Sequence, residues 1–167
     1  MIGRTLLILG FLLSGVPVFL AAASSDTERH LQAHVEKETD PVKKSKGTTR
    51  LARMKLEQAM QAYEHGRIEQ GAQLVTTYLG RIKDSWQLLK TCGRNAARDP
   101  RGFKELDIEL REDTRLLEDL KRRISFDDRG PLDQAGKELD DVRAEVLHAL
   151  FPVARAPEAA NPSAQRD

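Results

Sequence analysis

The sequence predicts an all-α protein, a small antiparallel bundle of four helices built from two helical hairpins. Apolar residues recur at helical spacing along residues 68–92, on a face too wide for one partner helix to cover. Glycine and proline interrupt the helical pattern between residues 93 and 102, which separates the two hairpins. The composition agrees, because 32% of the 167 residues are charged and only 5% are aromatic. We expect one folded domain over residues 49–152.

The first predicted hairpin joins helices at residues 49–65 and 68–92. Thr48 or Thr49 is a suitable N-cap for its first helix, and Gly66 can end that helix in a left-handed conformation. The second helix carries an apolar stripe with steps of three and four residues, formed by Ile68, Ala72, Val75, Leu79, Ile82, Trp86 and Leu89. This stripe should face the other helices, which makes this helix the centre of the bundle.

Small residues and one aromatic residue gather near the turn of this hairpin. They are Ala59, Ala62, Tyr63, Gly66, Ile68 and Gly71. The passage resembles the turn of a tetratricopeptide helical pair, over one hairpin of about 34 residues. No second copy follows, so the resemblance implies close packing of two helices and not a solenoid. An ordinary tight helical hairpin predicts the same packing.

The second predicted hairpin joins helices at residues 103–124 and 129–151. Apolar residues of its first helix follow a heptad, with Asp113 between two of the leucines. Its second helix continues the alternation of three and four from Leu132 to Ala149. Packing of both hairpins gives a four-helix bundle. A second hairpin that projects as a two-stranded coiled coil is the alternative, because its apolar stripe is narrow.

Residues 1–23 are organised as a secretory signal peptide. Arg4 precedes an apolar core, and three alanines ending at Ala23 supply the small residues of a cleavage site. Cleavage there predicts a soluble protein in the periplasm or outside the cell. An uncleaved N-terminal anchor is the alternative, in which the leader is the contact with the membrane.

The segments on either side of the predicted domain lack a strong helical pattern. A helix over residues 26–38 would bury only Leu31 and Val35, so we expect residues 24–48 to be a flexible polar linker. Residues 153–167 are rich in alanine and proline, which predicts a disordered tail.

The charge balance argues against nucleic-acid binding. Lysine and arginine number 27 and the acids 26, and loss of the leader removes Arg4 and no acid. The mature part is therefore neutral, whereas nonspecific binding to nucleic acid needs a basic face.

Cys92 is the single cysteine, so no disulfide forms within the chain. Its place after Leu89 favours a buried thiol, and a bridge between two chains of a homodimer is the alternative.

Four potential metal ligands recur at every fourth position before the predicted domain. They are Asp26, His30, His34 and Glu38. In a helix they would form one row, where two imidazoles can share a metal ion and carboxylates complete its coordination. A solvated polar face is the alternative, because the segment lacks packing to keep it helical.

Glu145 and His148 have the Glu-x-x-His spacing found in carboxylate-bridged di-iron bundles. Such bundles take this pair from each of two helices, and this chain contains it once. We therefore expect Glu145 and His148 to be surface residues near a helix end.

The densest cationic group lies on the loop between the hairpins. It comprises Arg94, Arg98, Arg101 and Lys104. Together these side chains could hold an anionic partner, such as a phosphate, a cell-wall carboxylate or an acidic protein surface. A charged loop without a ligand is the alternative.

Asp113 is the one charged residue on the predicted core stripe of its helix. A buried carboxylate without a partner is strongly destabilising, so we expect Asp113 to pair with an arginine or to lie where the bundle opens. A paired Asp113 could fix the registry of the helices or belong to a binding site.

No catalytic arrangement is visible in the sequence. It contains no glycine-rich phosphate loop, no G-x-S-x-G elbow and no CxxC pair, and nothing indicates a cofactor. These observations favour a noncatalytic exported protein that contacts a protein partner in the periplasm or cell envelope. The alternative hypothesis is a periplasmic metal- or anion-binding protein that uses His30 and His34 or the loop 94–104.

Overall fold

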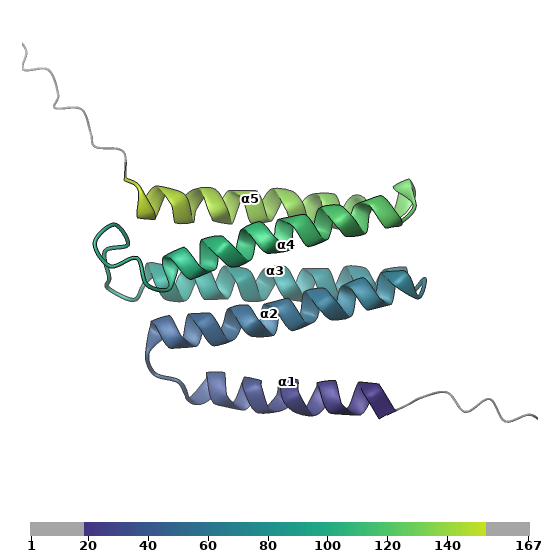
Figure 1. The fold of residues 1–167 in the computed structure, drawn as a ribbon, viewed down its shortest axis with the longest axis horizontal. Helices are drawn as coiled ribbons and strands as arrows, with labels where there is room; N and C mark the ends of the chain where they lie inside the picture. Colours follow the sequence, from purple (N-terminus) through teal and green to yellow (C-terminus); the bar gives the residue numbers. More distant parts are fainter. Residues whose placement is uncertain (1–18, 153–167) are drawn as a thin grey trace, which may run out of the picture.

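The computed structural model describes residues 19–152, and within them every regular element is helical (Figure 1). The α-helices are α1 (Phe19–Lys37), α2 (Pro41–Glu64), α3 (Ile68–Lys90), α4 (Phe103–Arg123) and α5 (Gly130–Leu150). A short 3-10 turn, η1 (Phe126–Asp128), connects α4 to α5. The predicted all-α class is therefore confirmed.

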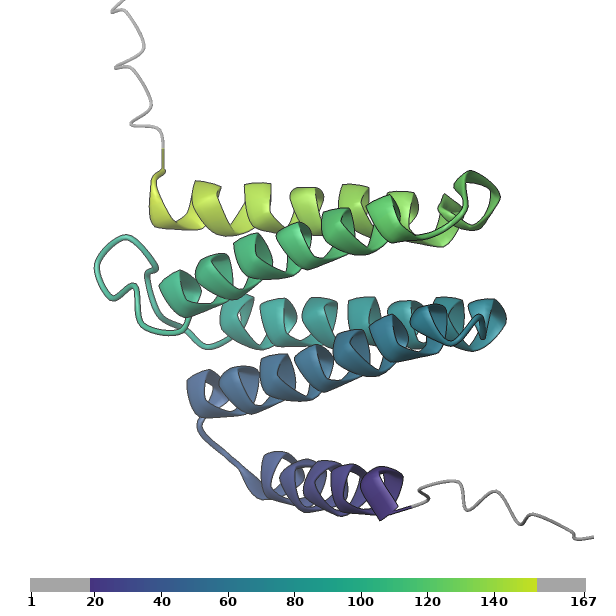
Figure 2. The same cartoon turned by 45° about the vertical axis from the view of Figure 1, so that its right-hand side comes forward.

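Helices α2 to α5 run antiparallel in sequence order and form a bundle, with α1 lying along α2 (Figures 1 and 2). Helix α2 packs on α3, and α4 packs on α5. Contacts of α3 with α5 and of α2 with α4 join the two hairpins. The second hairpin thus packs on the first along its length and does not project as a separate coiled coil.

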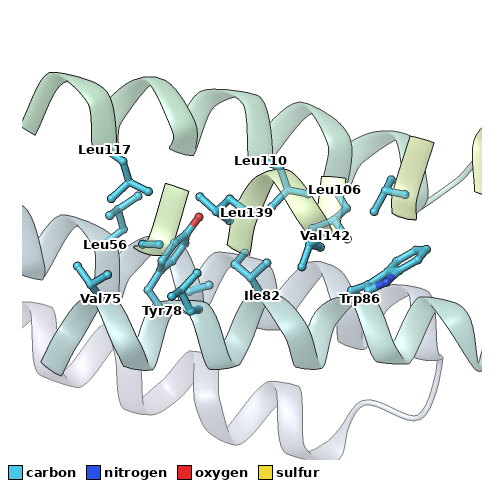
Figure 3. Close-up of a cluster of buried hydrophobic side chains, with 14 of the residues drawn as sticks. Leu56, Val75, Tyr78, Ile82, Trp86, Leu106, Leu110, Leu117, Leu139 and Val142 are labelled. Carbon is cyan, nitrogen blue, oxygen red and sulfur yellow. The ribbon is translucent and has the colours of Figure 1, made fainter. Parts of the chain in front are cut away.

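One continuous core links all four helices of the bundle (Figure 3). Its side chains, each at most 7% exposed, include Leu56, Val75, Tyr78, Ile82, Trp86, Leu106, Leu110, Leu117, Leu139 and Val142. The predicted stripe of α3 faces this core, although Ile68 and Ala72 at its start are only half-buried. Burial of such a stripe is the main source of stability for a helical bundle.

Small residues bring α2 and α3 close together, as the composition of their turn predicted. A Cβ atom added at Gly71 would lie 2.6 Å from the ring of Tyr63. Farther along the same interface, the buried hydroxyl of Ser85 lies 2.8 Å from that of Ser45 and 2.7 Å from that of Thr49. Gly66 ends the turn with a φ of 70°, a conformation that favours glycine.

The segment 24–48, for which the sequence predicted a flexible linker, is helical instead. Helix α2 begins at Pro41, eight residues before the predicted start. The side chain of Asp40 caps it, because Oδ1 accepts hydrogen bonds from the N–H groups of Val42 and Lys43 at 2.8 and 3.1 Å. Proline at the first helical position adds to this start signal.

Helix α1 is held by contacts with residues far away in the sequence. Val35 is 6% exposed, and a Cβ atom at Gly47 would lie 2.4 Å from its Cγ2. Glu28 forms an ion pair with Lys55 at 2.7 Å. These contacts stabilise a helix whose own apolar edge is too short to do so.

The remaining predicted helices begin and end within two residues of the observed ones. Most of the predicted signal peptide and the whole predicted tail lie outside the described residues. Helix α1 starts at Phe19 and so includes the predicted cleavage site at Ala23. Between residues 19 and 152, none of the helices has the length and apolar character needed to cross a bilayer.

Candidate functional site

A hollow of about 720 Å³ opens at the end of the bundle where the loop between the hairpins lies. We call it the loop-end hollow. Helix α3 contributes Trp86 and Lys90, α4 contributes Phe103, and α5 contributes Glu145 and His148. The loop after α3 supplies Arg94, Asn95 and Ala96. Its volume falls within the range of ligand pockets, roughly 300–1,000 Å³.

Two aromatic rings form the floor of the loop-end hollow. Trp86 is 5% exposed and Phe103 is 3% exposed. Their ring centroids are 6.1 Å apart at an interplanar angle of 82°, an edge-to-face pair. Trp86 lies at one end of the hydrophobic core, so the packing of the bundle holds its ring in place (Figure 3).

Glu145 connects this floor to the rim. Its Oε2 accepts a 2.6 Å hydrogen bond from Nε1 of Trp86, and Nζ of Lys90 lies 3.3 Å from the same oxygen. The Trp86 bond, followed by the Lys90 bond, lowers the pKa of Glu145 below its ordinary value. Lys90 also lies 5.4 Å above the Trp86 ring centroid, in a cation-π contact. These contacts fix a polar rim over an apolar floor.

Glu145 and His148 are both exposed near the end of α5, as expected from their isolated spacing. They line the same hollow and have no second Glu-x-x-His pair beside them among residues 19–152. That Trp86 and Phe103 line the same hollow could not be predicted from the sequence, because the four residues come from three helices.

A single carboxylate, Asp99, pairs with two of the four cations of the predicted arginine loop. Asp99 accepts hydrogen bonds from Arg101 Nε and Nη2 at 2.8 and 2.9 Å and from Arg94 Nη1 at 2.9 Å. The bond from Arg101 holds the pKa of Asp99 well below its usual range. Arg98 and Lys104 are exposed. Two of the four predicted anion-binding side chains, Arg94 and Arg101, are therefore paired with a carboxylate of the same loop.

The predicted metal row lies on α1 and on Glu38, the residue that follows it, along a groove beside α2. Asp26, His30, His34 and Glu38 all line this groove. Glu38 Oε1, however, accepts hydrogen bonds from the N–H groups of Thr39 and Asp40, both at 2.9 Å. In the part of the chain that the structure describes, no three His, Cys, Asp or Glu side chains group closely enough to hold a metal ion. Metal binding by this row stays a prediction.

Asp113 is 1% exposed and is paired with an arginine, one of the two outcomes expected for it. Its Oδ1 contacts Arg53 Nη1, and its Oδ2 accepts a 2.8 Å hydrogen bond from the Tyr78 hydroxyl. Burial raises the pKa of Asp113, against the bonds from Tyr78 and Arg53, which lower it. The residue does not line the loop-end hollow. This network joins helices of both hairpins and supports the registry interpretation.

Asp107 is a second buried carboxylate, which the sequence reasoning missed. It is 7% exposed and pairs with Arg143 at 2.9 Å and with Arg111 at 3.1 Å. A signal was present, since Arg111 follows Asp107 by one helical turn.

Cys92 is half-buried and packs against the core. Its thiol is therefore neither fully buried, as its place after Leu89 favoured, nor fully exposed.

Comparison with known proteins found no matching family model, curated protein or solved structure. Function is therefore inferred from the geometry of this chain. The loop-end hollow has two aromatic rings at its base and charged side chains around them. This arrangement suits an apolar side chain of another protein that is surrounded by polar groups.

Proposed function

We propose that this chain is a noncatalytic exported protein of the periplasm or cell envelope, and that it binds a protein partner through the loop-end hollow. The observation that carries the proposal is the aromatic pair Trp86 and Phe103 beneath the charged rim. Side chains that anchor protein interfaces enter such pockets, which exclude water around them. The partner would place an apolar side chain over Trp86 and polar groups against Glu145 and Lys90.

The noncatalytic part of the proposal is supported by how the ionisable groups are used. The buried carboxylates Asp107 and Asp113 are both paired with arginine. At the hollow, the bonds from Trp86 and Lys90 to Oε2 lower the pKa of Glu145, which makes its carboxylate a weaker base. A general base works best with a pKa near the operating pH, and a lowered carboxylate pKa lies far from it. A measured enzymatic turnover of the purified chain would contradict this part.

Export is supported by the organisation of residues 1–23. We expect the protein from fractionated cells to appear outside the cytoplasm with Ser24 as its first residue. N-terminal sequencing of the fractionated protein checks this. Recovery in the cytoplasm with Met1 and the leader intact would contradict it, and an intact leader in the membrane fraction would favour the anchor.

Partner binding is tested at Ala144, an exposed residue on the wall of the loop-end hollow. A photoreactive amino acid at position 144 should crosslink to the partner, which is then identified and purified. The substitution Ala144→Trp should fill the hollow and weaken binding of that partner by about tenfold or more. Far-UV circular dichroism of the variant verifies that the bundle is intact.

Gln134→Trp is the matched control. Gln134 is exposed on the same helix, ten residues earlier and therefore about 15 Å along its axis. We expect this variant to bind the partner as the unmodified chain does. Equal binding by the Ala144 and Gln134 variants would show that the partner does not use the hollow.

A further inference from the structure

A second hollow, of about 440 Å³, lies between the first half of α2 and the beginning of α4. We call it the α2–α4 pocket. Four basic side chains line it, Lys43, Lys46, Arg50 and Arg101, together with the acidic side chains Glu105 and Glu109. Val42 and Leu106 contribute an apolar part. The pocket does not share a lining residue with the loop-end hollow.

Three of these cations come from one face of α2. Lys43, Lys46 and Arg50 are spaced by three and four residues, so their side chains are neighbours on the helix surface. All three are exposed. None of them forms an ion pair with a carboxylate among residues 19–152. The sequence reasoning missed them as a site because it placed them on a flexible linker.

The other charges of the pocket are mostly engaged elsewhere. Glu105 Oε2 accepts a 2.6 Å hydrogen bond from the N–H of Gly102 and caps α4. Arg101 is bound to Asp99. Glu109 is the remaining carboxylate, and it faces three unpaired cations. Lys43 lies close enough to Asp40 to help lower the pKa of that carboxyl, and Asp26, Glu38 and Glu57 line the neighbouring groove between α1 and α2. The lining of the α2–α4 pocket itself carries more positive than negative side chains.

We infer that the α2–α4 pocket binds a phosphate group, with Lys43, Lys46 and Arg50 as its ligands. A phosphate offers several charged oxygens, so it can meet two ammonium groups and one guanidinium at once, which a single carboxylate cannot do as well. The half-buried side chain of Val42 gives the organic part of a phosphate ester an apolar surface. Such a group can belong to a small soluble ester or to a phospholipid headgroup.

The test uses the full-length chain and two probes. Titration calorimetry measures binding of glycerol 3-phosphate in solution. Cosedimentation compares vesicles of phosphatidylglycerol with vesicles of phosphatidylcholine. Each measurement is made on the unmodified chain and on the triple variant Lys43→Gln/Lys46→Gln/Arg50→Gln. Because any contribution of the leader to vesicle binding is common to both proteins, the difference between them reports on the pocket.

The matched control removes two lysines and one arginine elsewhere, in the variant Lys37→Gln/Arg115→Gln/Lys137→Gln. These three residues are exposed and do not line the pocket. We expect the pocket variant to lose about tenfold or more in affinity for one probe, and the control variant to bind close to the unmodified chain. A loss confined to glycerol 3-phosphate identifies a soluble ester, and a loss confined to phosphatidylglycerol identifies a headgroup. Equal binding by the pocket variant and the unmodified chain, or an equal loss in the control, would overturn the inference.

Discussion

The hydroxyl of Tyr78 donates a 2.8 Å hydrogen bond to Oδ2 of Asp113, and both side chains are at most 1% exposed. Tyr78 belongs to the central helix of the first hairpin and Asp113 to the second hairpin. Arg53 of α2 contacts the other carboxylate oxygen. One carboxylate thus connects α2, α3 and α4 inside the bundle. Any sliding of one hairpin along the other would leave buried polar groups without partners.

Asp113→Ala should destabilise the bundle by about 3 kcal/mol, because it leaves Arg53 and the Tyr78 hydroxyl without their acceptor. Denaturant unfolding followed by circular dichroism measures the change. Glu112→Ala is the control, since Glu112 is exposed at the preceding position of the same helix, and we expect its stability change to stay within about 0.5 kcal/mol. Equal unfolding midpoints for both variants would mean that the network contributes no stability.

The bond between Trp86 and Glu145 predicts a fluorescence change in acid. Trp86 is the single tryptophan, so all tryptophan emission comes from the ring whose Nε1 forms this bond. The pKa of Glu145 is lowered in the folded state, so the carboxylate bond persists at neutral pH and is lost as the pH falls through that lowered pKa. We expect a shift in emission with a midpoint below about 4.3, the ordinary pKa of glutamate.

Glu145→Gln should abolish this acid transition while the protein remains folded. Glu138→Gln is the control, because Glu138 lies on the same helix and its pKa is also lowered, by Lys83 and then Gln134. The control should keep the transition. A transition that survives in the Glu145 variant would assign it to another group.

Gly71→Ala should destabilise the protein although alanine is the better helix former. The added Cβ would lie 2.6 Å from the Tyr63 ring, which is itself 4% exposed and has little room to move. Overpacking of this kind costs about 1–3 kcal/mol, more than the gain of about 1 kcal/mol from helix propensity. Thermal unfolding measures the net effect. An increased melting temperature would show that the α2–α3 interface can open without cost.

The parts of the fold that depend on local pattern could be predicted from the sequence. The apolar period of α3 and the glycines at positions 66 and 102 set helix ends that agree with the structure within two residues. Helix α1 could not be predicted in this way, because its stability comes from Lys55 and Gly47 on another helix. A segment with few apolar residues is helical here because a neighbour supplies the missing contacts.

The sites show the same division. Pairing of a buried Asp113 with an arginine was one of two outcomes predicted from its place in the heptad, but the sequence did not identify the partner, because Arg53 lies 60 residues away on a different helix. The loop cations were visible in the sequence, but only the folded loop shows that Asp99 pairs with both Arg94 and Arg101. The loop-end hollow and the α2–α4 pocket each combine residues from at least two helices, so neither could be predicted from a single segment of the sequence.

Docking of α1 on α2 depends on the close approach of Val35 to Gly47, and it is tested by Gly47→Ala. A Cβ atom there would lie 2.4 Å from Cγ2 of Val35, a stiff β-branched side chain that is 6% exposed. We expect this clash to displace α1 while α2 to α5 stay folded. Hydrogen exchange should show faster exchange of the amides of residues 26–37 and unchanged protection in α3.

Gly80→Ala is the matched control for this last substitution, because both glycines lie inside long helices but nothing lies within 4 Å of a Cβ atom at Gly80. There the better helix propensity of alanine should stabilise the protein by up to about 1 kcal/mol and leave exchange in α1 unchanged. If α1 exchanged equally fast in the Gly47 variant and in the unmodified chain, the two helices would not be in the contact that makes residues 24–48 part of the folded domain.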